Sequence, residues 1–336
     1  MMEIDGNYLE GGGQILRTSV ALSCLTGKPV RIFNIRAGRP TPGLKAQHLA
    51  AISAVAELCN AKLEGGKIGS EEISFHPGKI DKEKLTINIS TAGSVGLVLQ
   101  AIFPACVNLT KPLKIEIEGG GTFGKWAPSV VYLQKVFLPI LERFGFKADV
   151  KILKHGFYPK GGARVVAEIF PSKLKGFSIE KGVDKIKGIS IVSEKLRNAK
   201  VAERQVEGAE KILEKLNLPV EIKTEYVNST SVGTGIELWT DKTILGAGTL
   251  GEIGKKAEKV GSECAEILAK EINSGATVDK HLADQLIPFM GLADGNSGCK
   301  VSELTNHTKT NIWVTEKFLD RRFEVKNVSG LYEIRA

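Results

Sequence analysis

The stretch GGGQILRTSVALSCLTGKPVRIFNI, residues 11–35, indicates the fold of this chain because its pattern recurs. A run of glycines leads into an apolar helix that ends near Gly27, and a strand follows from Pro29 to Ile35. TAGSVGLVLQAIFPACVNLTKPLKIEIEG, residues 91–119, repeats this order and again places Thr, Lys and Pro before the strand. Helices and strands that alternate in this way predict an α/β protein.

The segments that follow these two copies also correspond to each other. Residues 36–61 and residues 119–146 each combine glycines, a proline near a helix start, and a long apolar helix. In the first of them we predict Thr41 as the N-cap and Pro42 as the first helical residue. A third, more diverged copy spans residues 279–326. Such units cannot bury their apolar faces alone, so we expect the three repeats to pack side by side in one large domain.

One segment between the second and third copies breaks the pattern. Residues 181–274 contain a strand, a helix rich in Lys and Glu, two further strands, and a long helix predicted from Gly251 to Ile272. We interpret this segment as a small α/β domain inserted into the large one. The large domain is then built from residues 1–180 and residues 275–336.

The composition bounds the class of protein. The chain has 336 residues, 42% of them hydrophobic, and a formal net charge of +8. A basic balance suits a polyanionic partner such as nucleic acid, although it also serves solubility alone. The five cysteines are scattered without a C-x-x-C pair, so we expect reduced, mostly buried thiols. No apolar run approaches the length of about 18 residues that a membrane helix needs, and we expect a cytoplasmic protein.

Two glycine patterns suggest nucleotide loops, and neither fits. Residues 119–126 have the Walker A spacing, but Trp126 stands where a Ser or Thr must bind Mg²⁺. Residues 246–251 match G-x-G-x-x-G ahead of a predicted helix. No second strand ending in an acidic residue follows that helix at the distance a dinucleotide site requires. We therefore expect these glycines to serve tight turns and close backbone approach.

The loops of the first unit offer a better candidate for phosphate binding. Glu10 precedes three glycines, and Arg17 lies one helical turn further on. We expect the exposed N–H groups of the glycines and the guanidinium of Arg17 to suit an anion, and Glu10 to suit a metal ion. Arg36 and Arg39 occupy a second loop, and arginine suits bidentate contacts with phosphate. Solvated surface loops are an equally simple explanation, and the residues alone leave both open.

His307 is the most interesting single residue. It stands among Thr, Asn and Thr side chains in residues 305–310, just before a predicted helix, where the helix dipole favours an anion. A neutral imidazole there is suited to attack a phosphate, whereas a surface histidine in a capping loop is the plain alternative. Polar residues also interrupt otherwise apolar helices in the second and third units, and a buried position requires a partner for each. They are Gln100, Asp284 and Gln285.

Six motifs together resemble the RNA 3′-terminal phosphate cyclases, in order and over nearly the whole chain. They are EGGGQILR, IRAGRPTPGLKAQHL, a helix ending in LVLQ, HGFYPKGG (residues 155–162), LADQL and NHTKTNIWVTE. The resemblance implies three repeats, each like the C-terminal domain of translation initiation factor three, with a small inserted domain. It implies an ATP-dependent conversion of an RNA 3′-phosphate to a 2′,3′-cyclic phosphodiester through a histidine–AMP intermediate, with a divalent metal ion (Mg²⁺ or Mn²⁺).

The resemblance also implies roles for individual residues. His307 matches the nucleophile, and Glu10 the tentative metal ligand. The implied nucleotide-binding residues are Glu10, Arg17, Gln100, His281, Leu282, Ala283, Asp284 and Gln285, and those implied for phosphate are Arg36, Arg39 and Gln47. His281 departs from the tyrosine often found there in bacterial members, which leaves its contact with the nucleotide open. A homodimer is an open expectation. The competing interpretations are a non-catalytic cyclase-like ribosome-assembly protein that binds RNA, and an enolpyruvyl transferase.

Overall fold

The computed structural model describes residues 1–9 and 11–336, and its first unit is a four-stranded sheet covered by two helices. The elements are β1 (Met2–Asp5), α1 (Gly13–Thr26), β2 (Val30–Phe33), α2 (Ala46–Leu58), β3 (Lys62–Glu64) and β4 (Ile73–His76). The strand order is β1-β2-β4-β3, with β1 and β2 parallel and the other pairs antiparallel. Helix α1 connects the parallel strands, as a parallel pair requires a crossover.

The second unit repeats this topology. Its elements are β5 (Lys84–Ser94), α3 (Val95–Ala105), β6 (Leu113–Gly121), α4 (Val130–Tyr132), the π-turn η1 (Leu133–Phe137), α5 (Leu138–Arg143), β7 (Lys147–Lys154) and β8 (Arg164–Phe170). The order β5-β6-β8-β7 places each strand where its counterpart lies in the first sheet. Glycine is required at the end of β6, because Gly119 has a φ of 86° and a Cβ there would lie 2.1 Å from the Ile89 carbonyl oxygen.

The third unit begins earlier in the chain than the sequence pattern indicates. Its elements are α8 (Lys280–Leu292), β13 (Gly298–Val301), α9 (Asn306–Phe318), β14 (Glu324–Val328) and β15 (Leu331–Arg335), in the strand order β13-β15-β14. Residues 175–179 fill the place of a first, parallel strand: the Ile179 N–H donates to the Gly298 carbonyl at 3.0 Å, and the Gly298 N–H donates to Phe177 at 3.2 Å. The inserted segment therefore interrupts the third unit after its first strand.

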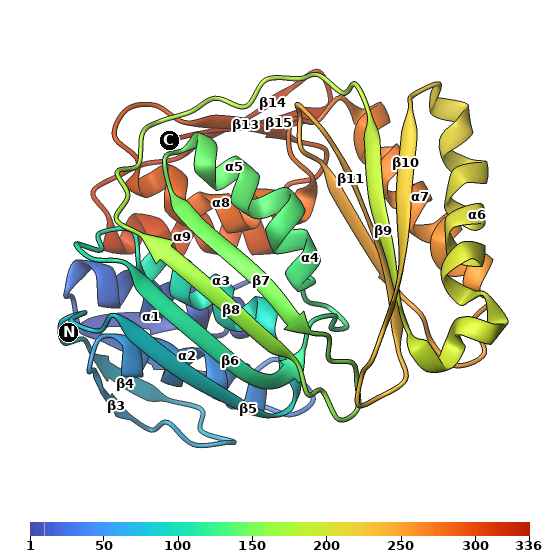
Figure 1. Ribbon diagram of the computed structural model, residues 1–336. Coiled ribbons are helices and arrows are strands. Elements are labelled where there is room, and N and C mark those ends of the chain that lie inside the picture. Colours follow the sequence, from blue (N-terminus) through green and yellow to red (C-terminus); the bar gives the residue numbers. More distant parts are fainter. Residues whose placement is uncertain (10) are drawn as a thin grey trace.

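The inserted segment forms a sheet with its two longer helices on one face (Figure 1). Its elements are β9 (Ile186–Ser193), the 3-10 turns η2 (Glu194–Ala199) and η3 (Glu214–Leu216), α6 (Val201–Leu213), β10 (Val220–Val227), β11 (Thr234–Thr240), β12 (Gly246–Leu250) and α7 (Ala257–Ser274). A separate core, which includes Leu213, Leu238 and Leu268, packs between sheet and helices. The exact boundaries at residues 181 and 274 stay predictions.

Two local predictions were wrong in this region and in the first unit. Residues 246–250 of the G-x-G-x-x-G pattern form strand β12, antiparallel to β11, and α7 starts at Ala257 instead of Gly251. Helix α2 starts at Ala46 with Lys45 as its N-cap, and Thr41 and Pro42 lie outside it. The reason is a turn at Gly43, which has a φ of 76° and donates its N–H to the Ile35 carbonyl, so the helix cannot begin before it.

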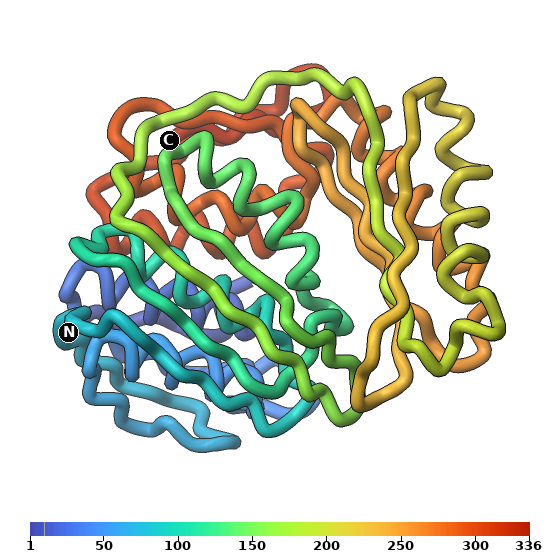
Figure 2. The backbone as a smooth tube through the Cα atoms, in the orientation of Figure 1, coloured from blue at the N-terminus to red at the C-terminus, as the bar shows by residue number. Residues whose placement is uncertain are grey.

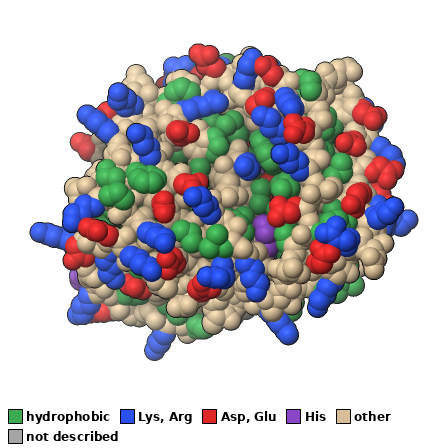
Figure 3. Space-filling view, viewed as in Figure 1, with side chains coloured by type: hydrophobic (Ala, Val, Ile, Leu, Met, Phe, Trp, Pro, Cys, Tyr) green, Lys and Arg blue, Asp and Glu red, His purple; other side chains and the backbone are tan. Residues whose placement is uncertain are grey.

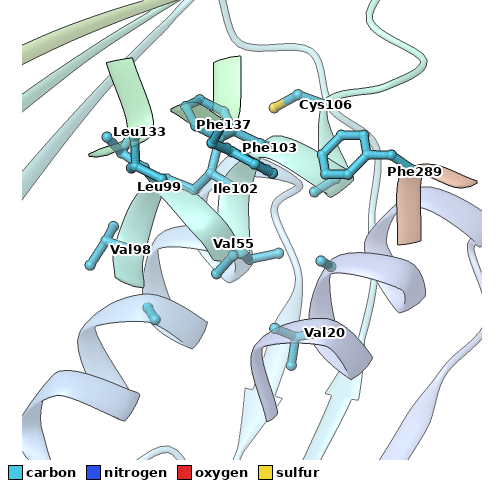
Figure 4. Close-up of a cluster of buried hydrophobic side chains, with 14 of the residues drawn as sticks. Val20, Val55, Val98, Leu99, Ile102, Phe103, Cys106, Leu133, Phe137 and Phe289 are labelled. Atoms are coloured by element: carbon cyan, nitrogen blue, oxygen red, sulfur yellow. The ribbon is translucent and has the colours of Figure 1, made fainter. Parts of the chain in front are cut away.

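The helices of the large domain lie in its interior, and its sheets lie outside them (Figures 1 and 2). Helix α3 is buried on almost all sides, which explains why its sequence is apolar all round. Side chains of all three units meet around it, as Val20, Val55, Ile102, Phe137 and Phe289 show (Figure 4). All five cysteines are buried and free, as predicted. Within the described part of the chain, no helix is both long and apolar enough to cross a membrane.

Candidate functional site

The N-terminal ends of several helices meet at one end of the large domain. Gly13, the first residue of α1, lies against the His48 ring in the first turn of α2; a Cβ on this glycine would come within 2.4 Å of the ring. In the second unit, a Cβ on Gly96 of α3 would lie 2.4 Å from the Pro128 carbonyl, which stands just before α4. Helix N-termini carry unpaired N–H groups and a partial positive charge, so their convergence favours an anionic ligand.

Buried hydrogen bonds tie the second and third units together at the same end. The Tyr132 hydroxyl of α4 lies 2.9 Å from both carboxylate oxygens of Asp279, the N-cap of α8. Asp279 also accepts the N–H groups of His281 and Leu282 at 3.0 Å each. The start of α8 is therefore fixed by a carboxylate that is 1% exposed and accepts four hydrogen bonds, one of them from the Gly246 N–H of the inserted segment.

Asn311 joins the first unit to the third. Its Oδ1 accepts the Thr18 hydroxyl of α1 at 2.7 Å, and its Nδ2 donates to the Asp284 carbonyl of α8 at 2.6 Å. Asn311 is 3% exposed, and a buried amide of this kind requires partners. Neither Thr18 nor Asn311 is among the residues predicted for the site. The signal that found Gln100, a polar residue on the buried face of a helix, applied equally to both.

A pocket opens between these helices. Its lining comes from α1, α3, η1, α8 and α9, and consists of Gln14, Arg17, Thr18, Gln100, Pro104, Phe137, Asp284, Gln285, Pro288, Phe289 and Asn311. The structure thus brings together Arg17, Gln100, Asp284 and Gln285, which the sequence analysis named from three separate units. Among the described residues, the buried Oε1 atoms of Gln14 and Gln285 accept no hydrogen bond. Two unsatisfied acceptors in one pocket indicate a ligand or water that donates to them.

The pocket shifts the pKa values of its two ionisable side chains, Asp284 and Arg17. Burial raises the pKa of Asp284 to about 8, although the positive charge of Arg17 acts in the opposite direction. Burial lowers the pKa of Arg17 to about 10, and the charge of Asp284 partly offsets this effect. At neutral pH the guanidinium of Arg17 is therefore charged, and the raised pKa of Asp284 weakens the negative charge that this carboxyl sets against it. Perturbed groups of this kind in a cleft are typical of functional sites.

The predicted phosphate-binding residues lie around the first turn of α2, in different roles. Arg36 is buried, and its Nη1 donates to the Thr41 and Gly43 carbonyls at 2.7 and 2.8 Å, which holds the loop before α2. Gln47 is exposed on α2, and its Cβ lies 3.9 Å from the position that a Cβ on Gly93 would take. Arg39 is half-buried on the same loop as Arg36. Glu10 lies outside the described residues.

His48, in the first turn of α2, is not among the residues predicted for the site. It is 5% exposed, and its Nδ1 accepts the Lys45 N–H at 3.2 Å. Burial, followed by the charges of Arg17 and Arg36, lowers the pKa of His48 to about 3. The ring is therefore neutral. With Nδ1 occupied as an acceptor, the proton resides on Nε2, on the side of the ring that faces the start of α1.

His307 is half-buried and is the second residue of α9. The sequence pattern predicts it just before the helix, whereas it lies in the first turn, because Thr305 caps the helix and accepts the Thr308 N–H at 3.1 Å. It stands one helical turn ahead of Asn311, on the helix that lines the pocket. His281 lies correspondingly at the start of α8, where it is exposed and its carbonyl accepts Gln285 Nε2 at 2.8 Å.

Two of the residues predicted to bind the nucleotide do not contribute side chains to the pocket. The side chains of Leu282 and Ala283 are fully buried in the core and do not line the pocket. Within residues 1–9 and 11–336, no three His, Cys, Asp or Glu side chains cluster as a metal site. The residues that line the pocket include Asp284, Gln14, Gln285 and Gln100, whose side-chain oxygens are hard donors of the kind that Mg²⁺ accepts alongside phosphate oxygens.

Comparison with known proteins gives one consistent result. The profile described as RNA 3′-terminal phosphate cyclase matches residues 8–325. A protein of that name from Methanosarcina barkeri is 47% identical over 334 residues, covering 99% of both chains. Another from Thermococcus kodakarensis is 48% identical, covering 98% of this chain and 96% of its own. The solved EPSP synthase from Acinetobacter baumannii, with 9% identity, covers 99% of this chain and 47% of its own at a TM-score of 0.40, which is too low to carry an argument.

Proposed function

Because the chain belongs to the RNA 3′-terminal phosphate cyclase family, we propose that it converts an RNA 3′-terminal phosphate into a 2′,3′-cyclic phosphodiester, with ATP as co-substrate and His307 as the nucleophile. We also propose that each of its three units has the fold of the C-terminal domain of initiation factor three. The observation that carries the proposal is the pocket that gathers Arg17, Gln100 and Asp284 next to the helix on which His307 stands.

The proposed reaction has three balanced steps. The His307 imidazole attacks the α-phosphorus of ATP, a nitrogen–phosphorus bond forms, and pyrophosphate leaves. An oxygen of the RNA 3′-phosphate then attacks that phosphorus, and the nitrogen–phosphorus bond breaks. Finally, the vicinal 2′-hydroxyl attacks the RNA phosphorus and loses its proton, and AMP leaves as the ring closes. A covalent intermediate replaces one difficult displacement with easier ones.

The residues of the site support the charge changes in these steps. The start of α9 places a positive helix end beside His307, which favours the approach of a phosphate. Arg17 is charged at neutral pH and is suited to bind the polyphosphate in the pocket. Gln100, Gln285 and Asp284 offer hydrogen-bonding groups for the nucleoside. His281 is exposed in the first turn of α8, the helix that carries Asp284 and Gln285, and its contact with the nucleotide stays open.

A divalent metal ion is part of this proposal. The oxygens of Asp284, Gln14 and Gln285 fit such an ion, with Glu10 as a further predicted ligand outside the described residues. When bound, the ion would neutralise charge on the phosphates of ATP. Arg39 and Gln47 are proposed to hold the RNA 3′-phosphate, whereas the contacts of Arg36 with two carbonyls indicate that it also fixes the shape of their loop.

The test is a covalent adduct. Incubation with ATP labelled at the α-phosphate and Mg²⁺ or Mn²⁺ should give a labelled protein whose label is released by acid, since a phosphoramidate is acid-labile. His307→Ala should abolish the label, whereas the matched His281→Ala variant should retain it at a reduced rate or in full. Label that persists in His307→Ala would refute the assignment of the nucleophile. A wild-type chain that binds RNA but never acquires label would favour the alternative of a non-catalytic RNA-binding protein.

A further inference from the structure

Two loops beside the site expose large aromatic side chains that the proposed reaction does not use. Trp126, between β6 and α4, is 90% exposed, and Tyr158, between β7 and β8, is 81% exposed. Aromatic residues of this size are usually buried at least in part. Trp126 also has a φ of 59°, a left-handed conformation that is strained for a bulky residue. The fold thus holds a tryptophan out into solvent against its ordinary preferences, as functional sites often do.

Hydrogen bonds and buried aromatic rings hold the two loops together. The Thr122 N–H donates to the Gly156 carbonyl at 2.9 Å, and the Thr122 hydroxyl lies 2.9 Å from His155 Nδ1. Beneath the exposed pair, the buried rings of Phe123 and Phe157 stack at 5.9 Å between centroids with an angle of 13° between their planes. Because buried aromatic rings anchor both loops, Trp126 and Tyr158 are presented on a pre-formed base and need little ordering on binding.

The inserted segment braces the same loops. The Lys160 N–H donates to Ser231 Oγ at 3.0 Å, and Lys125 Nζ lies 3.3 Å from a carboxylate oxygen of Glu252. A Cβ on Gly162 would come within 2.7 Å of Thr230 Oγ1. The aromatic loops therefore lie at the junction of the large domain and the inserted segment.

Three lysines flank the aromatic pair, and one of them, Lys125, is ion-paired with Glu252. Lys125, Lys154 and Lys160 are exposed on or next to the two loops, and Lys125 Nζ lies 5.2 Å from the centroid of the Trp126 ring. On the face seen in Figure 3, lysine and arginine side chains are scattered among acidic ones and do not form one continuous stripe. Lysines interleaved with exposed aromatic rings are typical of surfaces that bind single-stranded nucleic acid, because the lysines attract phosphates while the rings stack on bases.

The surface is continuous with the site. A Cβ on Gly124 would lie 3.5 Å from Ser94 Cβ, and one on Gly161 would lie 3.0 Å from the Thr91 carbonyl, so both loops touch the C-terminal end of β5 at residues 91–94. The same end of β5 approaches Gln47, because a Cβ on Gly93 would lie 3.9 Å from Gln47 Cβ. A strand whose 3′-phosphate is held at Gln47 would therefore meet the aromatic loops with the nucleotides that precede its end.

We propose that Trp126 and Tyr158, together with Lys125, Lys154 and Lys160, form the surface on which the bases upstream of the reacting 3′ end stack. The proposal rests on the proposed function, since it takes the RNA of that reaction as the occupant. It adds that recognition is independent of sequence, because every base offers a face for stacking. It also adds that binding improves with the length of the RNA until its upstream bases reach these loops.

The experiment measures RNA binding and adenylylation separately. Trp126→Ala and Tyr158→Ala should each weaken binding of a fluorescein-labelled, 3′-phosphorylated oligoribonucleotide about ten-fold, measured by anisotropy without ATP. Neither should change the rate of label transfer from ATP to protein in the absence of RNA. Phe170→Ala is the matched control: Phe170 is 38% exposed and pairs with Lys147 at the opposite end of the β7–β8 hairpin, so its loss should leave RNA binding unchanged.

A spectroscopic readout separates stacking from a merely structural role. The chain contains three tryptophans, of which Trp126 is highly exposed. RNA should quench part of the tryptophan emission of the wild type, and this part should be missing in Trp126→Phe, which keeps a stacking ring and so retains most of the affinity. Wild-type affinity in Trp126→Ala/Tyr158→Ala would overturn the proposal. So would an equal loss of RNA-free adenylylation in that variant, which would assign these rings to the nucleotide site. A wild type without cyclase activity that still shows the ten-fold effect would refute the proposed function alone.

Discussion

Asp284→Asn should make the protein more stable at high pH, because the ionised carboxylate is unfavourable in the pocket. Burial raises the pKa of Asp284 from 3.8 to about 8 in the folded chain. A raised folded pKa contributes stability that is fully present below the unfolded pKa and is lost as the pH rises through the folded pKa. The wild type should therefore lose stability steadily between about pH 4 and pH 8, and the asparagine variant should not lose this part.

The size of the effect follows from the same shift. At about 1.36 kcal/mol for each pKa unit, a rise from 3.8 to about 8 corresponds to an upper bound near 6 kcal/mol. Asp284 is not fully buried and the pocket opens to solvent, so we expect about 2 to 3 kcal/mol in practice. The charge of Arg17 needs no separate correction. It lowers the pKa of Asp284, and the value of about 8 already contains this effect.

Urea unfolding at pH 5 and pH 9, followed by circular dichroism, measures the difference. The gain in unfolding free energy of Asp284→Asn over the wild type should be larger at pH 9 than at pH 5. Asp294→Asn is the control, because that side chain is 74% exposed and paired only at 3.6 Å with Lys173, so its effect should be similar at both pH values. An asparagine variant that is no more stable than the wild type at pH 9 would contradict the reasoning. Adenylylation should fall in Asp284→Asn, as expected when a strained functional group is removed.

Two further predictions concern the contacts around the pocket. Asn311→Ala removes the hydrogen bonds to Thr18 and to the Asp284 carbonyl and leaves both groups buried without a partner, so the unfolding free energy should fall by about 2 to 4 kcal/mol; an unchanged urea midpoint would show that water replaces the amide. Arg39→Ala should slow transfer to RNA or cyclisation while the thermal midpoint stays near that of the wild type. Arg36→Ala should lower that midpoint because two carbonyls lose their donor, and a thermal shift assay of both variants tests the contrast.

The sequence by itself determined the repeated helix–strand pattern, the buried cysteines and most of the residues that the pocket gathers. Periodicity and glycine turns are local properties, so the correspondence between residues 11–35 and 91–119 was visible without coordinates. Gln100 and Asp284 were recognisable because a polar residue on a buried helical face needs a partner. Their position in one pocket was only implied, by resemblance.

Tertiary structure alone decided the features that depend on distant partners. Residues 175–179 fill the place of a first strand in the third unit because they form parallel bridges with residues 294 and 298, on the far side of the inserted segment. Residues 246–250 are a strand because β11 supplies their hydrogen bonds, although the glycine pattern favours a loop. Thr18 and Asn311 meet across 293 positions in the chain. Contacts between segments that are remote in sequence leave no local pattern in the sequence. The pocket and the aromatic loops could therefore be recognised only from the packing of the three units.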